Sequence, residues 1–297
     1  MLKNQRVLIT GVTGFIGRRL FSLLNKEGIE VLGISSKHSG DNIINCSLFD
    51  KNLLQETVRN FYPTTIVHLA AIANPVEQNV SSIYRTNVEG TVNLFEAIRL
   101  TSSTPRVVVA STAGVYGNQD QRAIPESAIP DPTNHYSCSK LASERVARLY
   151  ADQLNLRIDI LRLFNVIGIG QSENFLVPKL VKIFKNKVNS VELGNINAVR
   201  DFIDVEFVTN VIAAIIDRKD DRSSILNVCS GHGYSGEDIL DILSHLTDWQ
   251  PKIIQNDNLI RKNEIWRLVG DPSKLFAVLP YRPKCVKEIL SDMLAQA

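Results

Sequence analysis

The sequence predicts an α/β protein with a doubly wound parallel sheet, on two observations. The β-branched and leucine run 7–10 leads into a turn with glycines at 11, 14 and 17, followed by an amphipathic helical pattern over 14–27. Strand-like and helical patterns then alternate through the first half of the chain. Such alternation produces a parallel sheet whose ligands bind beyond the carboxyl ends of its strands.

The glycine turn predicts a phosphate site. A helix start carries N–H groups without intrahelical partners at the positive end of the peptide dipole, and glycines let a pyrophosphate come close to them. The alternative is that three small residues at this spacing serve only close packing of the strand against the helix. The cofactor contacts expected here are Gly11, Thr13, Gly14, Phe15, Ile16 and Gly17.

The composition excludes several classes of partner. The chain of 297 residues has 33 basic and 31 acidic residues, dispersed along it, so we expect neither a nucleic acid nor a membrane surface as its ligand. Its four cysteines, at 46, 138, 229 and 285, are far apart, which suits reduced thiols better than a disulfide frame or a metal site. Because it has no apolar run of membrane-spanning length and no signal-peptide pattern, we expect a cytoplasmic enzyme.

The end of the second predicted strand, 30–34, bears on the cofactor. An Asp or Glu at this point usually holds the free ribose 2′-hydroxyl of a dinucleotide, whereas a 2′-phosphate needs small polar and basic groups. The residues here are Ser35, Ser36 and Lys37, without a carboxylate. We therefore expect these three near the phosphate, with NADP(H) preferred over NAD(H). The alternative is an ordinary polar loop.

The apolar run 65–71 suits a buried parallel strand, and His68 within it is interpreted as a core histidine. The small-residue end of this strand, Leu69, Ala70 and Ala71, lets the backbone approach the cofactor. The other elements expected are helices over 51–60, 82–100, 136–154, 175–186, 204–217, 235–246 and 284–296, and strands over 106–111 and 225–231.

Hydroxyl, phenol and ammonium groups form a candidate catalytic set. Ser111 and Thr112 stand at the carboxyl end of a predicted strand, while Tyr136 and Lys140 share one face of a predicted helix. An ammonium beside a phenol favours the ionised phenol, so we expect Lys140 to lower the pKa of Tyr136 toward neutrality. Thr112 is suited to hydrogen-bond the same substrate oxygen. The alternative is a chance Tyr-x-x-x-Lys, which occurs in many helices.

Several motifs together resemble those of the extended short-chain dehydrogenases that act on nucleotide sugars. They are Thr10-Gly11-Val12-Thr13-Gly14-Phe15-Ile16-Gly17, His68-Leu69-Ala70-Ala71, Asn87-Val88-Glu89-Gly90-Thr91, the Ser-Thr strand end and the Tyr136/Lys140 pair. The resemblance covers nearly the whole chain and implies a Rossmann-type sheet. It implies that Tyr136 donates or accepts the proton and that Lys140 also holds the nicotinamide ribose. It further implies that Ser111 and Thr112 contact the sugar, that Asn87 contacts the cofactor, and that paired helices form a homodimer.

Two departures from the family pattern narrow the prediction. Members that dehydrate their sugar carry an Asp-Glu pair directly after the catalytic Thr, because loss of water needs its own acid and base. Here those positions are Ala113 and Gly114, which disfavours a 4,6-dehydratase and leaves keto-reduction or epimerisation. Ser47 and Leu48 stand where an Asp contacting adenine is expected, so the adenine contacts are not assigned.

The second half of the chain resembles the substrate side of the same family. Residues 162–171 match its R-x-F-N-x-x-G-x-G-Q strand exit, and 194–201 have the G-N-x-x-A-x-R-D form of GDP-mannose dehydratases and GDP-4-keto-6-deoxymannose reductases. Arg200 offers a planar donor fork suited to phosphate, although an Arg200–Asp201 surface pair is the alternative. The resemblance also assigns Arg261 to the diphosphate and Glu264 to the nucleoside ribose. The substrate contacts expected in this half are Asn165, Lys179, Asn195, Arg200, Arg261 and Glu264.

The resemblance implies two interleaved domains. We expect a dinucleotide-binding domain over 1–165 and 202–224 and a smaller α/β nucleotide-sugar domain over 166–201 and 225–297. The expected reaction is reduction of the C4 keto group of a nucleotide-linked 4-keto-6-deoxy sugar, with GDP-4-keto-6-deoxy-D-mannose giving GDP-D-rhamnose as the first choice. The talo product is not separable from the rhamno product at this level. A nucleotide-sugar 4-epimerase with tightly bound NAD and a non-catalytic NADP-binding regulatory protein stay open.

Overall fold

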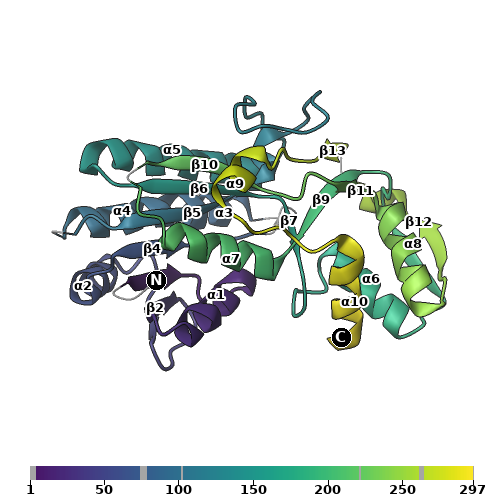
Figure 1. Cartoon of the computed structure of the whole chain (residues 1–297), viewed down its shortest axis with the longest axis horizontal. Coiled ribbons are helices and arrows are strands. Elements are labelled where there is room, and N and C mark those ends of the chain that lie inside the picture. The colour runs from purple at the N-terminus through teal and green to yellow at the C-terminus, as the bar shows by residue number, and fades with distance from the viewer. Residues whose placement is uncertain (1–4, 74–78, 102, 221, 261–263, 297) are drawn as a thin grey trace. The chain divides into compact units, whose positions relative to one another are not determined.

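The computed structural model describes residues 5–73, 79–101, 103–220, 222–260 and 264–296. The chain forms two compact units, each built from three separate stretches of sequence. Figure 1 shows the ribbon coloured by residue number from the N-terminus to the C-terminus. The first unit comprises 1–115, 134–162 and 209–226, and the second comprises 116–133, 163–208 and 227–297. The bounds differ from the predicted ones chiefly at 116–133 and 202–208, which belong to the second unit. What each unit binds stays a prediction.

A seven-stranded sheet dominates the first unit, with the strand order β10-β6-β5-β4-β1-β2-β3. β1 pairs in parallel with both β2 and β4, so the order reverses at β1 and creates a topological switch point. The predicted doubly wound parallel sheet is confirmed. Its strands are β1 (Arg6–Thr10), β2 (Glu30–Ser35), β3 (Ile43–Asn45), β4 (Thr65–His68), β5 (Arg106–Thr112), β6 (Ile158–Leu163) and β10 (Ser224–Val228).

Both faces of this sheet are buried. Along β1, Leu8 joins a core with Leu94, Phe95 and other apolar side chains of the packed helices, while the alternate residues Val7 and Ile9 are equally buried. Helix α4 packs against both α2 and α5. The helices are α1 (Phe15–Lys26), α2 (Lys51–Phe61), α3 (Val80–Tyr84), a π-helix η1 (Arg85–Glu89), α4 (Gly90–Arg99), a 3₁₀ turn η2 (Ala113–Tyr116), α5 (His135–Leu154) and α7 (Val205–Ile216).

Local polar groups explain where the main helices begin. The Asp50 carboxylate accepts a hydrogen bond from the Leu53 N–H at 3.1 Å at the start of α2, and the Asn134 side chain accepts from the Ser137 N–H at 2.9 Å at the start of α5. Gly28 after α1 has a φ of +73°, the left-handed conformation that favours glycine at the end of a helix.

Three predicted elements need correction. The predicted helix 82–100 is interrupted, because η1 inserts a π-helical turn between α3 and α4. The predicted strand 65–71 ends at residue 68, where the Ala70 N–H turns to the Thr10 hydroxyl at 3.2 Å instead of continuing the ladder. The predicted strand 225–231 is Ser224–Val228.

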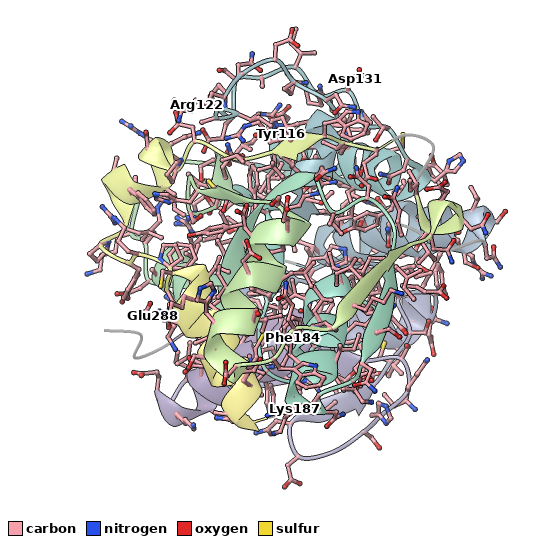
Figure 2. All side chains as sticks on the ribbon, turned by 90° about the vertical axis from the view of Figure 1, so that its right-hand side faces the viewer. Tyr116, Arg122, Asp131, Phe184, Lys187 and Glu288 are labelled. Atoms are coloured by element: carbon pink, nitrogen blue, oxygen red, sulfur yellow. The ribbon has the colours of Figure 1, made fainter. Side chains whose placement is uncertain are left out.

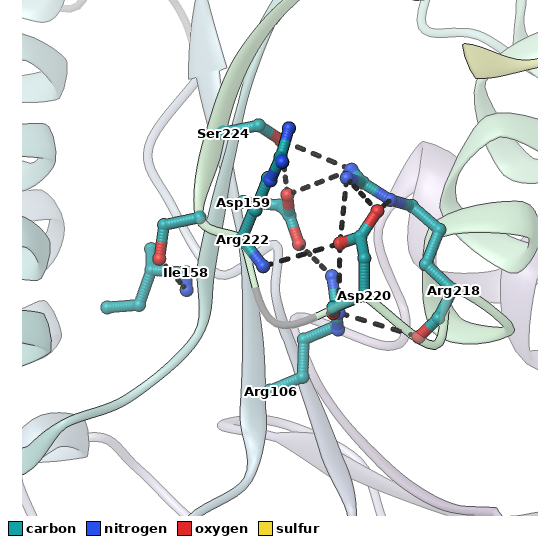
Figure 3. A network of polar contacts seen from close by, with 8 residues as sticks. Arg106, Ile158, Asp159, Arg218, Asp220, Arg222 and Ser224 are labelled. Carbon is teal, nitrogen blue, oxygen red and sulfur yellow. Dashed lines mark hydrogen bonds and ion pairs between the residues drawn. The ribbon is translucent and has the colours of Figure 1, made fainter.

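A buried ion-pair cluster, shown in Figure 3, lies at the amino ends of β5 and β6. Arg106 Nη1 is 2.6 Å from an oxygen of Asp159, and both side chains are buried. Arg106 Nη2 donates to the backbone carbonyls of Arg218 and Asp220, and the Ser224 hydroxyl donates to the carboxylate of Asp159. The cluster therefore fixes the segment between α7 and β10 to the sheet.

The second unit has a smaller sheet centred on β9, which pairs antiparallel with β11 and parallel with β7 and β13. β8 and β12 form a separate parallel pair. Its strands are β7 (Asn165–Ile167), β8 (Ser190–Leu193), β9 (Val199–Asp204), β11 (Gly233–Tyr234), β12 (Lys252–Gln255) and β13 (Arg267–Leu268). Its helices are α6 (Leu176–Lys185), α8 (Gly236–Thr247), a 3₁₀ turn η3 (Asp257–Leu259), α9 (Ser273–Val278) and α10 (Val286–Gln296).

Helices α6, α8 and α10 enclose the core of the second unit. Phe184, Leu243 and Leu290 are almost fully buried in it, and Figure 2 shows Phe184 inside this packing. Lys187 follows α6 and is exposed, with its ammonium 5.9 Å from the ring centroid of Trp249. No described helix of either unit combines the length and apolarity needed to span a membrane.

Candidate active site

The glycine turn after β1 is packed as a close-approach site. Gly11 has a φ of +71°, and a Cβ on it would lie 2.7 Å from the Ala70 nitrogen. A Cβ on Gly17 would collide with the Gly11 carbonyl, so close packing of the helix on the turn requires glycine at position 17. Gly14 is the N-cap of α1 and makes no side-chain hydrogen bond, so the first-turn N–H groups can donate to a ligand. Phe15 and the neighbouring Ile16 are half-buried within the first turn.

At the end of β2, the three residues assigned to a 2′-phosphate differ in their exposure to solvent. Ser35 is buried, and its hydroxyl accepts from the backbone N–H groups of Lys37 and His38, each at 3.3 Å. It also lies 3.2 Å from the hydroxyl of Thr13 in the glycine turn. Ser36 and Lys37 have exposed side chains. Ser35 therefore shapes the turn that presents its two neighbours.

His68 is a satisfied core histidine. The Thr91 hydroxyl donates to the Asn87 carbonyl at 2.5 Å, so it accepts from His68 Nε2 at 3.0 Å, and Nδ1 is left to accept from Thr10 at 2.8 Å. Burial, followed by the charge of Lys140, lowers the pKa of His68 to about 3. The imidazole is therefore neutral at physiological pH.

Asn87 in η1 ties the segment after β4 to helix α5. Its side-chain oxygen accepts from the Ile72 N–H at 2.8 Å, and its amide donates to the Ser139 hydroxyl at 2.9 Å. Leu69, Ala70 and Ala71, which precede Ile72, are half-buried. These residues were assigned to the cofactor together with Asn87, and the structure places them beside one another at the carboxyl end of β4.

The structure brings together the three predicted catalytic side chains. Thr112 ends β5 close to the phenol of Tyr136, while Lys140 lies one turn further along α5 with its side chain buried. Burial raises the pKa of Tyr136 to about 12, partly offset by the Thr112 hydrogen bond. The prediction of a lowered phenol pKa is therefore wrong, because desolvation of the phenolate outweighs the favourable contacts. Burial also lowers the pKa of Lys140 to about 8, although Glu144 opposes that shift.

The two positions after Thr112 leave little room for added carboxylates. Ala113 is almost fully buried in η2, and a Cβ on Gly114 would collide with the Ser137 hydroxyl. The Gly114 N–H donates to the Thr112 hydroxyl at 3.1 Å. The packing is consistent with the prediction against a 4,6-dehydratase.

A buried triad behind Lys140 was missed at the level of sequence. Glu144 accepts from Arg162, with Nε at 3.1 Å and Nη2 at 2.8 Å, and also from the Ser111 hydroxyl. All three side chains are buried. The Ser111 hydroxyl thus points to Glu144, and its predicted contact with the sugar stays a prediction. The signal that could have identified Glu144 is its spacing, one helical turn after Lys140.

Several predicted substrate residues meet in the second unit. Arg200 Nη2 is 3.4 Å from Glu264 Oε1, and the Asn195 amide is 3.4 Å from Glu264 Oε2. The Asn165 amide donates at 3.1 Å to the carbonyl of Asp201, next to Arg200 in β9. Asn195, Arg200 and Glu264 thus form one polar group near the start of β9, and Asn165 is bonded to the next residue of the same strand.

Asp201 does not form the surface pair that was the alternative for Arg200. Its buried carboxylate accepts from the backbone N–H groups of Ser230 and Gly231, each at 2.9 Å, and from the Ser230 hydroxyl at 2.7 Å. Lys179 is exposed on α6 and donates to the Glu192 carbonyl at 3.4 Å. Arg261 lies outside the described residues. Within the described part of the chain, no group of three metal-ligating side chains is arranged to hold a metal ion.

Comparison with known proteins identifies the family. A model of the NAD dependent epimerase/dehydratase family matches residues 7–229. The chain belongs to this family. The family predicted from the motifs is thereby confirmed.

Two relatives align with nearly the full chain. A GDP-6-deoxy-D-talose 4-dehydrogenase from Aggregatibacter actinomycetemcomitans is 39% identical over 293 residues, which cover 97% of each chain. A GDP-6-deoxy-D-mannose reductase from Pseudomonas aeruginosa is 27% identical over 303 residues, again covering 97% of each chain. The predicted class of enzyme, a nucleotide-sugar oxidoreductase or epimerase, is confirmed by these relatives.

Solved structures share the fold over the same length. MoeE5 in complex with UDP-glucuronic acid and NAD superposes with a TM-score of 0.89 at 28% identity, covering 98% of each chain. RMD from Pseudomonas aeruginosa complexed with NADPH superposes with a TM-score of 0.86 at 26% identity, covering 99% of this chain and 98% of that one. The family is thus NAD(P)-dependent.

Proposed function

We propose that this enzyme transfers a hydride at C4 of a GDP-linked 6-deoxyhexose, reducing GDP-4-keto-6-deoxy-D-mannose to GDP-6-deoxy-D-talose in the keto-to-alcohol direction. The observation that carries the proposal is that Thr112, at the end of β5, and the phenol of Tyr136 lie together, with Lys140 one turn further along α5. A phenol and a hydroxyl that both hydrogen-bond the substrate carbonyl oxygen can stabilise it as it becomes an alkoxide.

The side chains have separate roles in the proposed step. Tyr136 gives its proton to the sugar O4 as hydride reaches C4, and its raised pKa keeps that proton in place until the alkoxide forms. Thr112 holds the same oxygen, and the buried Lys140 supplies positive charge beneath the phenol. When bound, a reduced nicotinamide supplies the hydride. In the reverse direction Tyr136 takes the proton from the alcohol.

The glycine turn fits the pyrophosphate of this cofactor. Gly11 packs so closely on the Ala70 backbone that it has no room for a Cβ, and Gly14 leaves the first-turn N–H groups of α1 without a side-chain cap. We assign the 2′-phosphate of NADP(H) to Ser36 and Lys37, whose exposed side chains follow the buried Ser35. In the second unit, Arg200 and Asn165 suit the substrate diphosphate and Glu264 the ribose.

The relatives support the proposed C4 configuration of the product. Talose and mannose differ only at C4, so GDP-6-deoxy-D-talose and GDP-D-rhamnose derive from one 4-keto compound by hydride addition to opposite faces. The 39% identity to a GDP-6-deoxy-D-talose 4-dehydrogenase, against 27% to a GDP-6-deoxy-D-mannose reductase, favours the talo product over the rhamno product that motifs alone suggested.

The test is reduction of GDP-4-keto-6-deoxy-D-mannose, generated from GDP-mannose by a dehydratase, followed as loss of reduced-nicotinamide absorbance. We expect stoichiometric consumption of NADPH and a product with a small H3–H4 proton coupling, because H4 is equatorial in the talo sugar. A large trans-diaxial coupling would replace the talo assignment with rhamno. Retention of bound cofactor without consumption, together with interconversion of UDP-glucose and UDP-galactose, would replace the reductase with a 4-epimerase.

Cofactor preference has its own test, the ratio of kcat/KM with NADPH to that with NADH. We expect the wild type to favour NADPH and Lys37→Ala to lower the ratio by roughly fivefold, since one exposed ion pair is worth about 1 kcal/mol. His38→Ala is the matched control in the same turn. An unchanged ratio in Lys37→Ala would remove Lys37 from the phosphate site.

A further inference from the structure

Lys140 sits in a closed environment whose charges can be enumerated. On its own helix it faces Tyr136 and Glu144, each one turn away, and from β4 it faces His68, which is neutral as described above. β5 presents only the hydroxyls of Ser111 and Thr112. Glu144 carries the only negative charge in this set, and Arg162 of β6, whose Nη2 is 2.8 Å from that carboxylate, carries a positive charge beside it.

The charged groups of the other helices that pack on α5 are directed elsewhere. In η1, Arg85 and Glu89 are exposed and pair with each other at 3.9 Å. In α4, the Glu96 carboxylate binds Arg99 at 2.6 Å and the hydroxyl of Tyr150, near the far end of α5. These groups therefore do not compete with Glu144 for the ammonium of Lys140.

The Glu144 carboxylate is held in a fixed place by groups outside its helix. Arg162 in β6 donates a hydrogen bond to each of its oxygens, and Ser111 in β5 donates to one of them. Four per cent or less of each of the three residues is exposed, so the charge is shielded from screening by water and salt. Ser111 also directly precedes Thr112, so the same contact fixes the end of β5.

We propose that Glu144, anchored by Arg162 and Ser111, is a positioning residue that keeps the buried ammonium of Lys140 protonated beneath Tyr136. This inference rests on the proposed function for its consequence in catalysis, but not for its electrostatics. Without the carboxylate, burial alone acts on Lys140 and favours the neutral amine, which supplies no positive charge to the phenol. In an enzyme without this carboxylate, kcat is therefore lost at a lower pH than in the wild type.

The direct measurement is the ionisation of Lys140, followed by NMR of enzyme with ¹³C,¹⁵N-labelled lysine and assigned by loss of the signal in Lys140→Met. We expect the wild-type signal to titrate near pH 8 and the signal in Glu144→Gln to titrate lower by at least about one pH unit. The alkaline limb of the kcat profile moves by the same amount. Asp159→Asn is the matched control, since it disrupts an equally buried ion pair elsewhere in the first unit.

Equal titration of Lys140 in Glu144→Gln and in Asp159→Asn would overturn the proposal. If Glu144→Gln does not fold, the double variant Glu144→Gln, Arg162→Met removes both charges of the pair. Loss of the Arg162 charge opposes the effect of losing Glu144, so we expect the pKa of Lys140 to shift in the same direction by a smaller amount, because Glu144 is the charge that lies one helical turn from it. An unshifted Lys140 in a folded double variant also overturns the proposal. Absence of sugar reduction by the wild type would instead refute the proposed function, leaving the NMR result to decide the role of Glu144.

Discussion

Two buried carboxylate–arginine pairs lie at opposite ends of the same two strands. At the amino ends, Asp159 of β6 pairs with Arg106 of β5 at 2.6 Å, and at the carboxyl end Arg162 of β6 pairs with Glu144 of α5 at 2.8 Å. A serine hydroxyl donates to the carboxylate in each. The chemistry is the same, but the neighbours differ.

The neighbours decide what each pair does. The amino-end pair continues through Arg106 to the backbone carbonyls between α7 and β10, so it holds a loop. The carboxyl-end pair stands one helical turn from Lys140, so its field acts on a titratable group. Buried ion pairs contribute little net stability because of desolvation, and position therefore matters more than their number.

The largest expected effect is on the proton donor. Tyr136→Phe should lower kcat by about 10²- to 10⁴-fold, the usual contribution of a positioned general acid, with cofactor binding and thermal stability near the wild type. Steady-state rates with NADPH titration by fluorescence check this. A rate within a few-fold of the wild type would remove Tyr136 from the reaction.

The next effect separates the two pairs. Asp159→Ala leaves the Arg106 guanidinium buried without its carboxylate, and we expect the free energy of unfolding to fall by about 3–5 kcal/mol. Urea unfolding measures the loss. The pH dependence of kcat in the folded fraction should stay as in the wild type. A shift of the alkaline limb of the kcat profile in Asp159→Ala would show that the amino-end pair also acts on Lys140. The two pairs would then not differ in function.

The smallest effects come from the two serines, which form a matched comparison. Ser111→Ala and Ser224→Ala each remove one hydrogen bond to a buried carboxylate, and each should cost about 1.5–3 kcal/mol of unfolding free energy. Only Ser111→Ala should also lower kcat, by roughly tenfold or less, because Ser111 fixes the strand end that carries Thr112. Equal kcat in the two variants would contradict the positioning role of Ser111.

Much of the first unit could be predicted because its signals are local. The glycine turn and the Tyr136/Lys140 spacing each depend on residues within one turn or strand, and the structure has them as expected. His68 was correctly interpreted as a core residue, since its two threonine partners satisfy both ring nitrogens.

The rest depends on contacts that a linear pattern does not encode. The pKa of Tyr136 was predicted in the wrong direction because spacing shows the ammonium but not the burial that opposes it. The triad of Ser111, Glu144 and Arg162 unites two strands and a helix, so only Glu144 had a local signal. The roles assigned to the second-unit residues, Arg200 and Glu264 among them, stay predictions.

The π-helical turn at 85–89 has a consequence for tolerance to insertions and deletions. Such a turn holds one more residue than an α-helical turn, so α3 and α4 are rotated relative to a continuous helix. Deleting one residue there would restore regular winding and turn the whole face of α4 by about 100°. Thr91 would then leave His68, and Asn93 would leave the Leu48 carbonyl to which it now donates at 3.0 Å. We therefore expect homologues to keep the same number of residues in the segment α3–η1–α4. Insertions and deletions among them are expected in surface loops instead.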